Sequence, residues 1–428
     1  MATLVFANHM PQIENGLIAA GQEAIVCMTE PHARLRGPAE QLPYRVVTIN
    51  HWDAWSEIAA VAASLRGQIE HVATRWEGAI VPAAFVRDLL DLPGQTMHEA
   101  VGYVDKAVMK SRLHQGGVPV AQHRIVRHVP DVAAAADELG WPIVVKPLRG
   151  FASTNTHVIR SPDELADAQT AGRFEIPLDA SPYYAGDPAF VGLARQGRIL
   201  VEEYVDIVHE YHCDGLWIDG EPVYQLPGLY HTPPLRGMGG MLGSVLLPTG
   251  SHDSRIVSDL ATRAAKTLGI MTGFTHAEVL RTAGGRWLLG EIAYRPGGGG
   301  IQQAIGHAYG VDVPAIQAQV ACGQTPDVQL TTRAPHPVVG WTGPAVPAGI
   351  VTAIADRQAL LGHPGVIDAT VAVKVGQQGG RTGSGLWGGL AGYTYLEGDS
   401  VGQVLGMMHD AAERYRVRVD EPQLAGAR

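Results

Sequence analysis

The sequence predicts an α/β fold with an α+β core, divided among roughly three domains. Residues 1–97 alternate apolar runs with helix-like segments, a pattern typical of a parallel sheet with crossover helices. Two β-hairpins are expected in the middle of the chain, and a β-rich unit is expected over residues 335–428. At about 150 residues per domain, a chain of 428 residues has room for three such units.

The N-terminal unit should end near residue 97, after the turn signal Leu92-Pro93-Gly94. Its apolar runs have the length of strands, and residues 55–65 have the pattern of a helix. No G-x-G-x-x-G follows the first strand, which disfavours a dinucleotide site. The expected strands are 4–6, 24–28 and 46–49.

The middle unit is expected over residues 98–334. Glycines end two of its helices, at Gly116-Gly117 and at Gly140. Ser161-Pro162-Asp163-Glu164 combines a capping box with proline at the first helical position, which predicts a helix start. Asp219-Gly220 is a hairpin turn. The expected elements are helices at 97–114, 131–139 and 254–268, strands at 143–147 and 199–201, and hairpins at 210–223 and 274–293.

The last unit begins after residue 334. We expect strands near 349–354 and 369–375, a Gly-rich loop at 376–392 and a terminal helix over 401–415.

Charge and composition exclude several classes of function. Thirty-two Lys and Arg against 42 Asp and Glu give a net charge of −10, which argues against nucleic-acid or anionic-membrane partners. No apolar run reaches the ~18 residues of a membrane span, and the N-terminus lacks the shape of a signal peptide. The three cysteines are too far apart for a disulfide framework or a metal knuckle, so we expect a cytoplasmic protein.

A pair of glutamates in the second hairpin is the most informative pattern. A two-residue turn at Gly284-Gly285 would place Glu278 directly opposite Glu291, with Cβ atoms ~5 Å apart. Facing carboxylates among apolar neighbours repel unless a cation neutralises them, and Mg²⁺ prefers such oxygens. The alternative is a solvated pair on an exposed ribbon. His276 would share their face, where a packed histidine is commoner than a ligand.

An anion-binding turn is expected directly after this hairpin. Arg295 offers a planar fork for a carboxylate or phosphate, and the glycines 297–300 let backbone N–H groups approach an anion before the next helix. The alternative is a flexible glycine loop.

Lysine is rare in this chain, with five lysines against 27 arginines. Lys146 ends an apolar strand and is followed by a loop of small residues, which suits a phosphate oxygen. Lys106 stands near a helix start. Solvated surface lysines are the alternative for both, and Lys110, Lys266 and Lys374 receive no functional role.

The segment from Ile199 to Glu210 has the groups that a purine nucleotide needs. Backbone groups at Glu202-Glu203-Tyr204-Val205 follow an apolar strand end and suit an adenine edge, while Glu210 suits ribose hydroxyls. A charged turn is the alternative. Arg236, in a Gly/Pro-rich segment, suits a substrate carboxylate, or else belongs to an ordinary surface loop.

Taken in order, these motifs resemble those of the ATP-grasp carboxylate–amine ligases, especially the L-amino acid (dipeptide) ligases. The resemblance covers about residues 70–310, and the tail beyond 335 resembles the β-rich domain that closes such ligases. The motifs are Asp105-Lys106, Ile143-Val144-Val145-Lys146-Pro147, Val201-Glu202-Glu203-Tyr204-Val205, His276-Ala277-Glu278 and Glu291-Ile292-Ala293-Tyr294-Arg295-Pro296-Gly297-Gly298.

The resemblance implies an ATP-grasp fold, ATP and Mg²⁺ as cofactors, and a role for each motif. Lys106 and Lys146 would contact the ATP phosphates, Ser153 would cover the γ-phosphate, and Lys146 and Arg295 would be catalytic. The adenine would be held by Glu203, Tyr204 and Val205, its amino group by Glu202, and the ribose by Glu210. Mg²⁺ would be bound by Glu278 and Glu291, and the substrate would be contacted by Glu77, Arg236, His276 and Gly298.

Two departures from the family pattern stand out. The covering loop keeps only Gly150 where relatives are richer in glycine, which implies a stiffer closure. Ala293 stands where many members have a metal-binding Asn, so that one Mg²⁺ site would need water or a bridging Glu291. The amino acid ligase branch shares this second departure.

The resemblance therefore implies an enzyme that joins a small-molecule carboxylate, as an amino acid, to an amine through an acyl phosphate. Peptide natural-product synthesis is one setting, and a homodimer is one expectation because dimers are common among similar ligases. The alternatives are a purine-pathway carboxylase or glycinamide-type ligase, and a non-catalytic ATP-binding protein.

Overall fold

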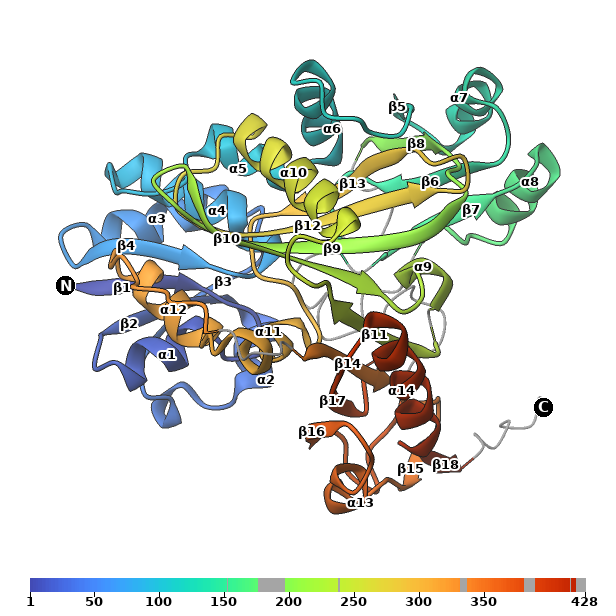
Figure 1. Ribbon diagram of the computed structural model, residues 1–428. Helices are drawn as coiled ribbons and strands as arrows, with labels where there is room; N and C mark the ends of the chain where they lie inside the picture. The colour runs from blue at the N-terminus through green and yellow to red at the C-terminus, as the bar shows by residue number, and fades with distance from the viewer. Residues whose placement is uncertain are drawn as a thin grey trace, which may run out of the picture.

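The computed structural model describes residues 1–151, 153–175, 197–237, 239–331, 337–380, 389–415 and 417–420. The mixed α/β class is confirmed, with one parallel sheet and three antiparallel sheets (Figure 1). Part of the predicted Gly-rich loop, 381–388, and the predicted boundary at 334–335 lie outside these residues. Within the described ranges, no helix is long and apolar enough to cross a membrane.

A parallel sheet in the order β3-β2-β1-β4 forms the N-terminal unit. It is buried on both faces: Leu4 and Val5, whose side chains point to opposite sides, are 0% and 1% exposed. The predicted strands and helix are confirmed. The elements are β1 (Ala2–Phe6), α1 (Ile13–Ala19), β2 (Ala24–Thr29), α2 (Glu30–Arg36), β3 (Arg45–Ile49), α3 (Trp55–Leu65), β4 (Ile69–Thr74), the 3₁₀ turn η2 (Glu77–Ala79) and α4 (Ile80–Leu90).

The single helix predicted at 97–114 is wrong, because two helices occupy this segment. They are α5 (Met97–Val104) and α6 (Lys106–Gln115). Asp105 has an extended backbone, and its side chain accepts hydrogen bonds from the N–H groups of Ala107 and Val108, so it ends one helix and caps the next. The break places Lys106 in the first turn of α6.

A small antiparallel sheet, in the order β5-β8-β6-β7, packs against two helices. Half of the predicted capping box is present in the second helix: the Ser161 hydroxyl accepts from the Glu164 N–H, but the Glu164 carboxylate accepts from the Arg160 N–H instead of that of Ser161. The elements are β5 (His123–Val126), α7 (Val132–Leu139), β6 (Ile143–Pro147), β7 (His157–Ile159), α8 (Pro162–Thr170) and β8 (Ile199–Glu203).

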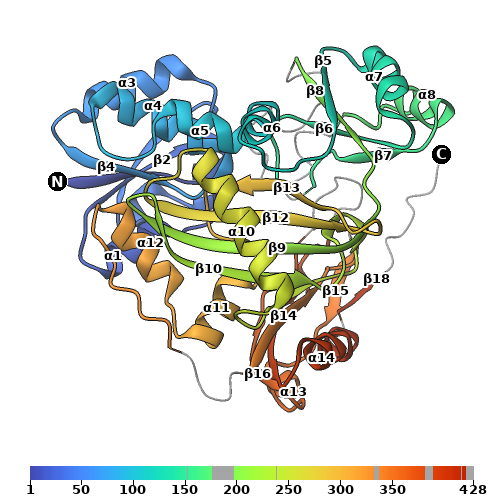
Figure 2. The ribbon, with the colours of Figure 1, turned by 45° about the horizontal axis from the view of Figure 1, so that its top comes forward.

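A large antiparallel sheet, in the order β13-β12-β9-β10-β11-β14-β17-β16, runs through the rest of the molecule. Helix α10 (His252–Thr267) crosses one face of it and covers the apolar side chains there (Figure 2). Both predicted hairpins are present. The strands are β9 (Ile207–Ile218), β10 (Glu221–Tyr230), β11 (Met241–Leu246), β12 (Gly273–Thr282), β13 (Trp287–Ala293), β14 (Val338–Pro344), β16 (Val366–Val371) and β17 (Gly392–Gly398).

The turn of the second hairpin differs from the predicted two-residue turn. Thr282 and Arg286 bracket a three-residue loop, which shifts the register by one residue. A β-bulge at Gly290 shifts it back, so that Glu278 pairs with Glu291 as predicted. The bulge also lets Leu289 face the α10 core, while Glu291 faces the other side of the sheet.

The C-terminal segment continues the large sheet through β14, β17 and β16, so this sheet crosses the predicted division between the second and third units. Helix α12 packs on α1, with Ala318 and Ala321 in the N-terminal core. The domain limits 1–97, 98–334 and 335–428 remain a prediction. The other elements are α9 (Pro234–Gly237), α11 (Ile301–Tyr309), α12 (Val313–Ala321), β15 (Ile350–Ala353), α13 (Arg357–Leu361), α14 (Val401–Arg414) and β18 (Arg418–Asp420).

Candidate functional site

One face of the large sheet, the face away from α10, gathers polar side chains from neighbouring strands. Glu291 opposes Glu278, which in turn opposes His212 on the next strand. Opposed residues, and residues two apart on one strand, share a face. The register therefore aligns one polar row across β13, β12, β9, β10 and β11. Its members are Glu210, His212, Asp214, Tyr230, Ser244, His276, Glu278 and Glu291.

The two opposed glutamates form the acidic centre of this row. Burial and the facing Glu291 carboxylate raise the pKa of Glu278 above its ordinary value. Burial acts in the same direction on Glu291, but Lys106 and Lys146 reverse the effect and lower its pKa. Lys106 Nζ lies 2.9 Å from Glu291 Oε1 and donates to the Gly150 carbonyl at 2.7 Å. Arg295 and Lys146 oppose the rise at Glu278 but do not cancel it, so the pair combines one carboxylate with a lowered pKa and one with a raised pKa.

A second buried carboxylate binds two lysines. Glu202 is 5% exposed, and its oxygens lie 2.6 Å from Lys146 Nζ and 2.6 Å from Lys110 Nζ. Burial alone would raise the pKa of Glu202, but the two lysines lower it to about 2. Lys110 also donates to the Gly290 carbonyl at 3.4 Å, so this one side chain contacts both the small and the large sheet.

Lys110 is not among the site residues that the sequence predicts. A signal was available, because Lys110 follows Lys106 by one helical turn in a chain with very few lysines, and residues four apart share a helix face.

Arg295 and Glu77 lie far apart in the sequence and form an ion pair in the structure. Arg295 Nε donates to Glu77 Oε2 at 2.9 Å, and both side chains are largely buried. Burial raises the pKa of Glu77 although Arg295 opposes this shift, and the Glu291 carboxylate adds to it. Both predicted residues therefore lie beside the glutamate pair, and the Glu77 carboxylate is already bound by the guanidinium.

The turn after Arg295 is fixed by hydrogen bonds. The Gly297 N–H donates to Asp214 Oδ1 at 2.7 Å, and Gln302 Nε2 donates to the Gly297 carbonyl at 2.9 Å. Gly298 is exposed, with open space where a side chain would be. The glycine turn thus presents backbone to solvent beside Arg295.

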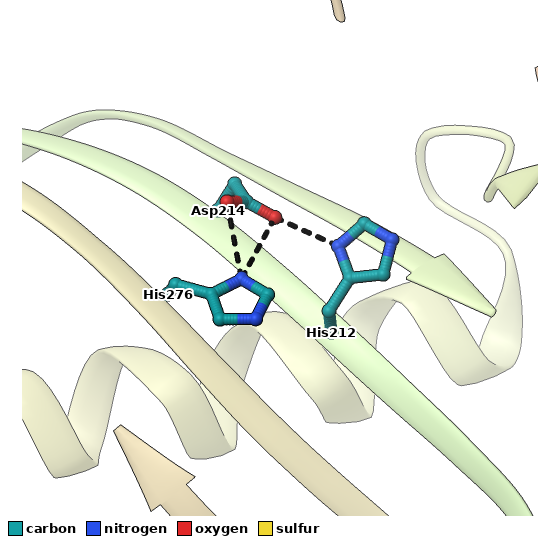
Figure 3. Close-up of side chains that lie close together, drawn as sticks. All are labelled: His212, Asp214 and His276. Atoms are coloured by element: carbon teal, nitrogen blue, oxygen red, sulfur yellow. Dashed lines mark hydrogen bonds and ion pairs between the residues drawn. The ribbon is translucent and has the colours of Figure 1, made fainter. Parts of the chain in front are cut away.

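A buried network of two histidines and one aspartate extends the polar row (Figure 3). Asp214 Oδ2 lies 2.7 Å from His212 Nδ1, and the two Asp214 oxygens lie 3.2 and 3.3 Å from His276 Nδ1. Within the described residues, this is the one group of three or more His, Cys, Asp or Glu side chains whose ligand atoms lie close enough together to hold a metal ion. His212 Nε2 is already bonded to Ser244 Oγ at 2.9 Å, which makes this a hydrogen-bonded network. The sequence reasoning missed His212 and Asp214.

The segment predicted to bind adenine lies at the end of β8. The Glu203 N–H donates to the Gln122 carbonyl at 2.9 Å, and Glu203 Oε1 accepts from Arg286 and from the Gln122 N–H. Tyr204 donates its N–H to the Pro142 carbonyl. Of the backbone groups named for adenine, the amide of Val205 has no partner among the described residues.

Three other predicted residues differ in how close they lie to the centre. Glu210 is buried and near Glu278, and burial together with that carboxylate raises its pKa well above the ordinary value. Arg236 lies on the exposed side, 3.3 Å from Asp206 Oδ1. No contact within the described ranges joins Ser153 to the glutamate pair.

The loop that was predicted to cover the nucleotide is held against the N-terminal unit. Arg149 forms a two-pronged ion pair with Asp53, at 3.1 and 3.3 Å, and the ring of Phe151 meets Trp76 edge-on, with centroids 4.9 Å apart. Ala152 lies outside the described residues. These contacts place the start of the loop beside Glu77 and Lys106.

Residues 139–303 match the family model described as an ATP-grasp domain. In sequence, the chain is 28% identical over 277 residues to an L-arginine-specific L-amino acid ligase from Bacillus subtilis, covering 65% of this chain and 62% of that protein. It is 26% identical over 197 residues to a D-alanine–D-alanine ligase from Pseudomonas fluorescens, covering 45% and 54%. The chain therefore matches less than two thirds of either relative's length.

The fold is similar to that of solved structures over nearly its whole length. An L-amino acid ligase from Bacillus licheniformis superposes with a TM-score of 0.73 at 16% identity, covering 98% of both chains. An N5-carboxyaminoimidazole ribonucleotide synthetase from Thermotoga maritima gives a TM-score of 0.69 at 16% identity, covering 98% and 100%. These likenesses establish the fold, and the predicted ATP-grasp architecture is confirmed. Residues 139–303 are therefore an ATP-grasp domain, and the chain is similar in sequence to carboxylate–amine ligases that contain such a domain.

Proposed function

We propose that this protein is an ATP-dependent ligase that forms an amide bond between a carboxylate, as in an amino acid, and an amine, releasing ADP and phosphate. The observation that carries the proposal is the facing pair Glu278 and Glu291, ringed by Lys106, Lys146 and Arg295. The similarity to an L-amino acid ligase supports the choice of an amino acid as the carboxylate.

Lys106 and Lys146 are the residues that we assign to the ATP phosphates. Each is held by a carboxylate in this structure, Lys106 by Glu291 and Lys146 by Glu202. The Glu202 and Glu291 carboxylates outweigh the effect of burial and raise the pKa of Lys146. Ser153, Glu203, Tyr204, Val205 and Glu210 are assigned to the remainder of the nucleotide by resemblance.

Glu278 and Glu291 would hold Mg²⁺. The donor set fits a hard cation, because two carboxylates face each other and the pKa of Glu278 is raised by burial and by its partner. When bound, Mg²⁺ supplies neutralisation of phosphate charge. The methyl side chain of Ala293 offers no ligand oxygen of the kind that an Asn side chain would supply.

The proposed reaction has two displacements. A carboxylate oxygen attacks the γ-phosphorus, the bond to the bridging oxygen of ADP breaks, and an acyl phosphate forms. The amine then attacks the acyl carbon, loses a proton, and displaces phosphate. We assign Arg295 to the negative charge on the reacting acyl group, because its guanidinium lies beside the glutamate pair. Positioning and charge stabilisation dominate the rate of such a reaction.

Glu77, Arg236, His276 and Gly298 are proposed as substrate contacts. Glu77 adjoins Arg295 and suits the amino group of an amino acid whose carboxylate reacts. Arg236, which is half-exposed, suits a second carboxylate at the entrance.

A phosphate-release screen over pairs of amino acids and amines, with mass detection of products, tests the proposal. We expect at least one pair to release phosphate together with an amide product. Dependence on bicarbonate or a phosphoribosyl amine would instead favour a purine-pathway type of reaction. ATP binding without turnover across all these compounds would reject a ligase.

A further inference from the structure

The N–H of Gly297 is bonded to Asp214 and its carbonyl to Gln302, and these two hydrogen bonds fix the direction of the Gly298 N–H. The Gly297 carbonyl points at Gln302. The 297–298 peptide is trans, so the Gly298 N–H points away from Gln302 and from helix α11. No atom lies within 4 Å of the place that a Cβ of Gly298 would take, and within the described ranges the Gly298 N–H has no hydrogen-bond partner. A free, oriented N–H therefore stands three residues after Arg295.

Asp214 holds the other side of Gly297, and this contact requires glycine. A Cβ at position 297 would lie 2.6 Å from Asp214 Oδ1 and 3.0 Å from His276 Nδ1. The carboxylate comes close enough to accept the Gly297 N–H at 2.7 Å only because that Cβ is absent.

The orientation of Asp214 is fixed by a chain of donors. Trp341 Nε1 can only donate, and it does so to Ser244 Oγ at 2.8 Å. The Ser244 hydroxyl is then free to donate to His212 Nε2, which leaves the proton of His212 on Nδ1, facing Asp214. Asp214 thus accepts from His212, His276 and Gly297.

We propose that Asp214 and Gln302 are positioning residues that clamp Gly297 and thereby aim the Gly298 N–H, together with Arg295, at the oxygen of the reacting acyl group. This inference rests on the proposed ligase function. Negative charge grows on that oxygen as the amine attacks, and an N–H held in advance stabilises it without reorganisation. Neither residue contacts the nucleotide in this assignment.

The test uses Asp214→Asn, Gln302→Met and the double variant of the full chain, assayed with a substrate pair from the phosphate-release screen. We expect each single variant to lower kcat about ten- to hundredfold, since small misplacements of reacting groups have effects of this size. KM for ATP and the affinity for ADP should stay within about twofold. The kcat of the double variant should lie within about threefold of the kcat of the less active single variant, because both residues act through one peptide.

Two controls match these substitutions. Gln303→Met alters the exposed neighbour of Gln302 on α11, and Asp253→Asn alters a carboxylate that binds Tyr211 on the α10 side of the large sheet. Both should keep kcat. If Asp214→Asn fails to fold, Gln302→Met carries the test, since Gln302 is only half-buried.

The inference is overturned if kcat is unchanged in both variants, if the two effects multiply, or if ADP affinity falls in step with kcat. It is also overturned if purified wild-type protein holds one transition-metal ion per chain that is lost in Asp214→Asn, because the cluster would then be a metal site. Amide exchange separates this inference from the ligase proposal: Gly297 should exchange faster in Asp214→Asn even if no substrate pair releases phosphate.

Discussion

Glu278 and Glu291 face each other across β12 and β13 because an extra residue in β13, Gly290, corrects the register that the three-residue turn had shifted. Without a bulge, residues 289 and 291 would share a face of the sheet. With it, Leu289 is buried under α10 while Glu291 joins the polar row. The bulge at Gly290 is thus what makes the two carboxylates face each other on one side of the hairpin.

Replacing either glutamate by glutamine should remove ATP turnover. We expect Glu278→Gln and Glu291→Gln each to lower carboxylate-dependent ADP formation at least a hundredfold, because the amide cannot replace a charged metal ligand. Glu221→Gln, at an exposed glutamate paired with Lys266, is the control and should keep full activity. ADP formation that persists in Glu291→Gln with all substrates present would contradict the metal role.

Lys110→Met should destabilise the protein far more than the same change at Lys266. Lys110 is 2% exposed and bonded to a buried carboxylate, and breaking such a pair costs about 3–5 kcal/mol. Lys266 forms an exposed pair with Glu221, worth about 0–1 kcal/mol. Urea unfolding measures both free energies. Equal losses in the two variants would show that Lys110 is not part of a coupled buried network.

The contribution of Glu202 to the free energy of unfolding should depend on pH. Its pKa is about 2 in the folded chain against an ordinary 4.5, so its contribution is complete above pH 4.5 and is lost as the pH falls towards 2. The difference in unfolding free energy between wild type and Glu202→Gln should therefore be largest above pH 4.5 and shrink towards pH 2. A difference that is constant over this range would contradict the two-lysine assignment.

Arg295→Lys should impair the reaction although it keeps the charge. A lysine lacks the planar fork that binds Glu77 through Nε and the Pro296 carbonyl through Nη1. We expect kcat to fall about a hundredfold while the affinity for ADP, measured by calorimetry, changes little. Wild-type kcat in Arg295→Lys would show that only the charge is needed.

Local signals predicted most of the fold. The caps at Ser161 and Gly140, the Asp219-Gly220 turn and the apolar runs each act over a few residues, and the structure confirms the elements that they predicted. The break at Asp105 was missed because the apolar pattern runs on through both helices. The bulge at Gly290 was missed because its effect on the register cancels that of the longer turn.

The site was less predictable, because its contacts join distant parts of the chain. Arg295 and Glu77 are 218 residues apart, and no periodicity relates them. The spacing of Lys110 from Lys106 indicates a shared helix face, but no local pattern shows that Glu202, on β8 of the small sheet, lies against that face. Asp214 and His212 alternate on one strand, which shows a shared face but not the neighbours on it.

Transfer of labelled oxygen tests the central claim most directly. The carboxylate substrate of a productive pair is prepared with ¹⁸O in both carboxyl oxygens, and the phosphate released in the wild-type reaction is analysed by mass spectrometry. An acyl phosphate intermediate predicts one ¹⁸O atom in each phosphate, with ADP and amide formed in equal amounts. Unlabelled phosphate alongside amide formation would contradict the account.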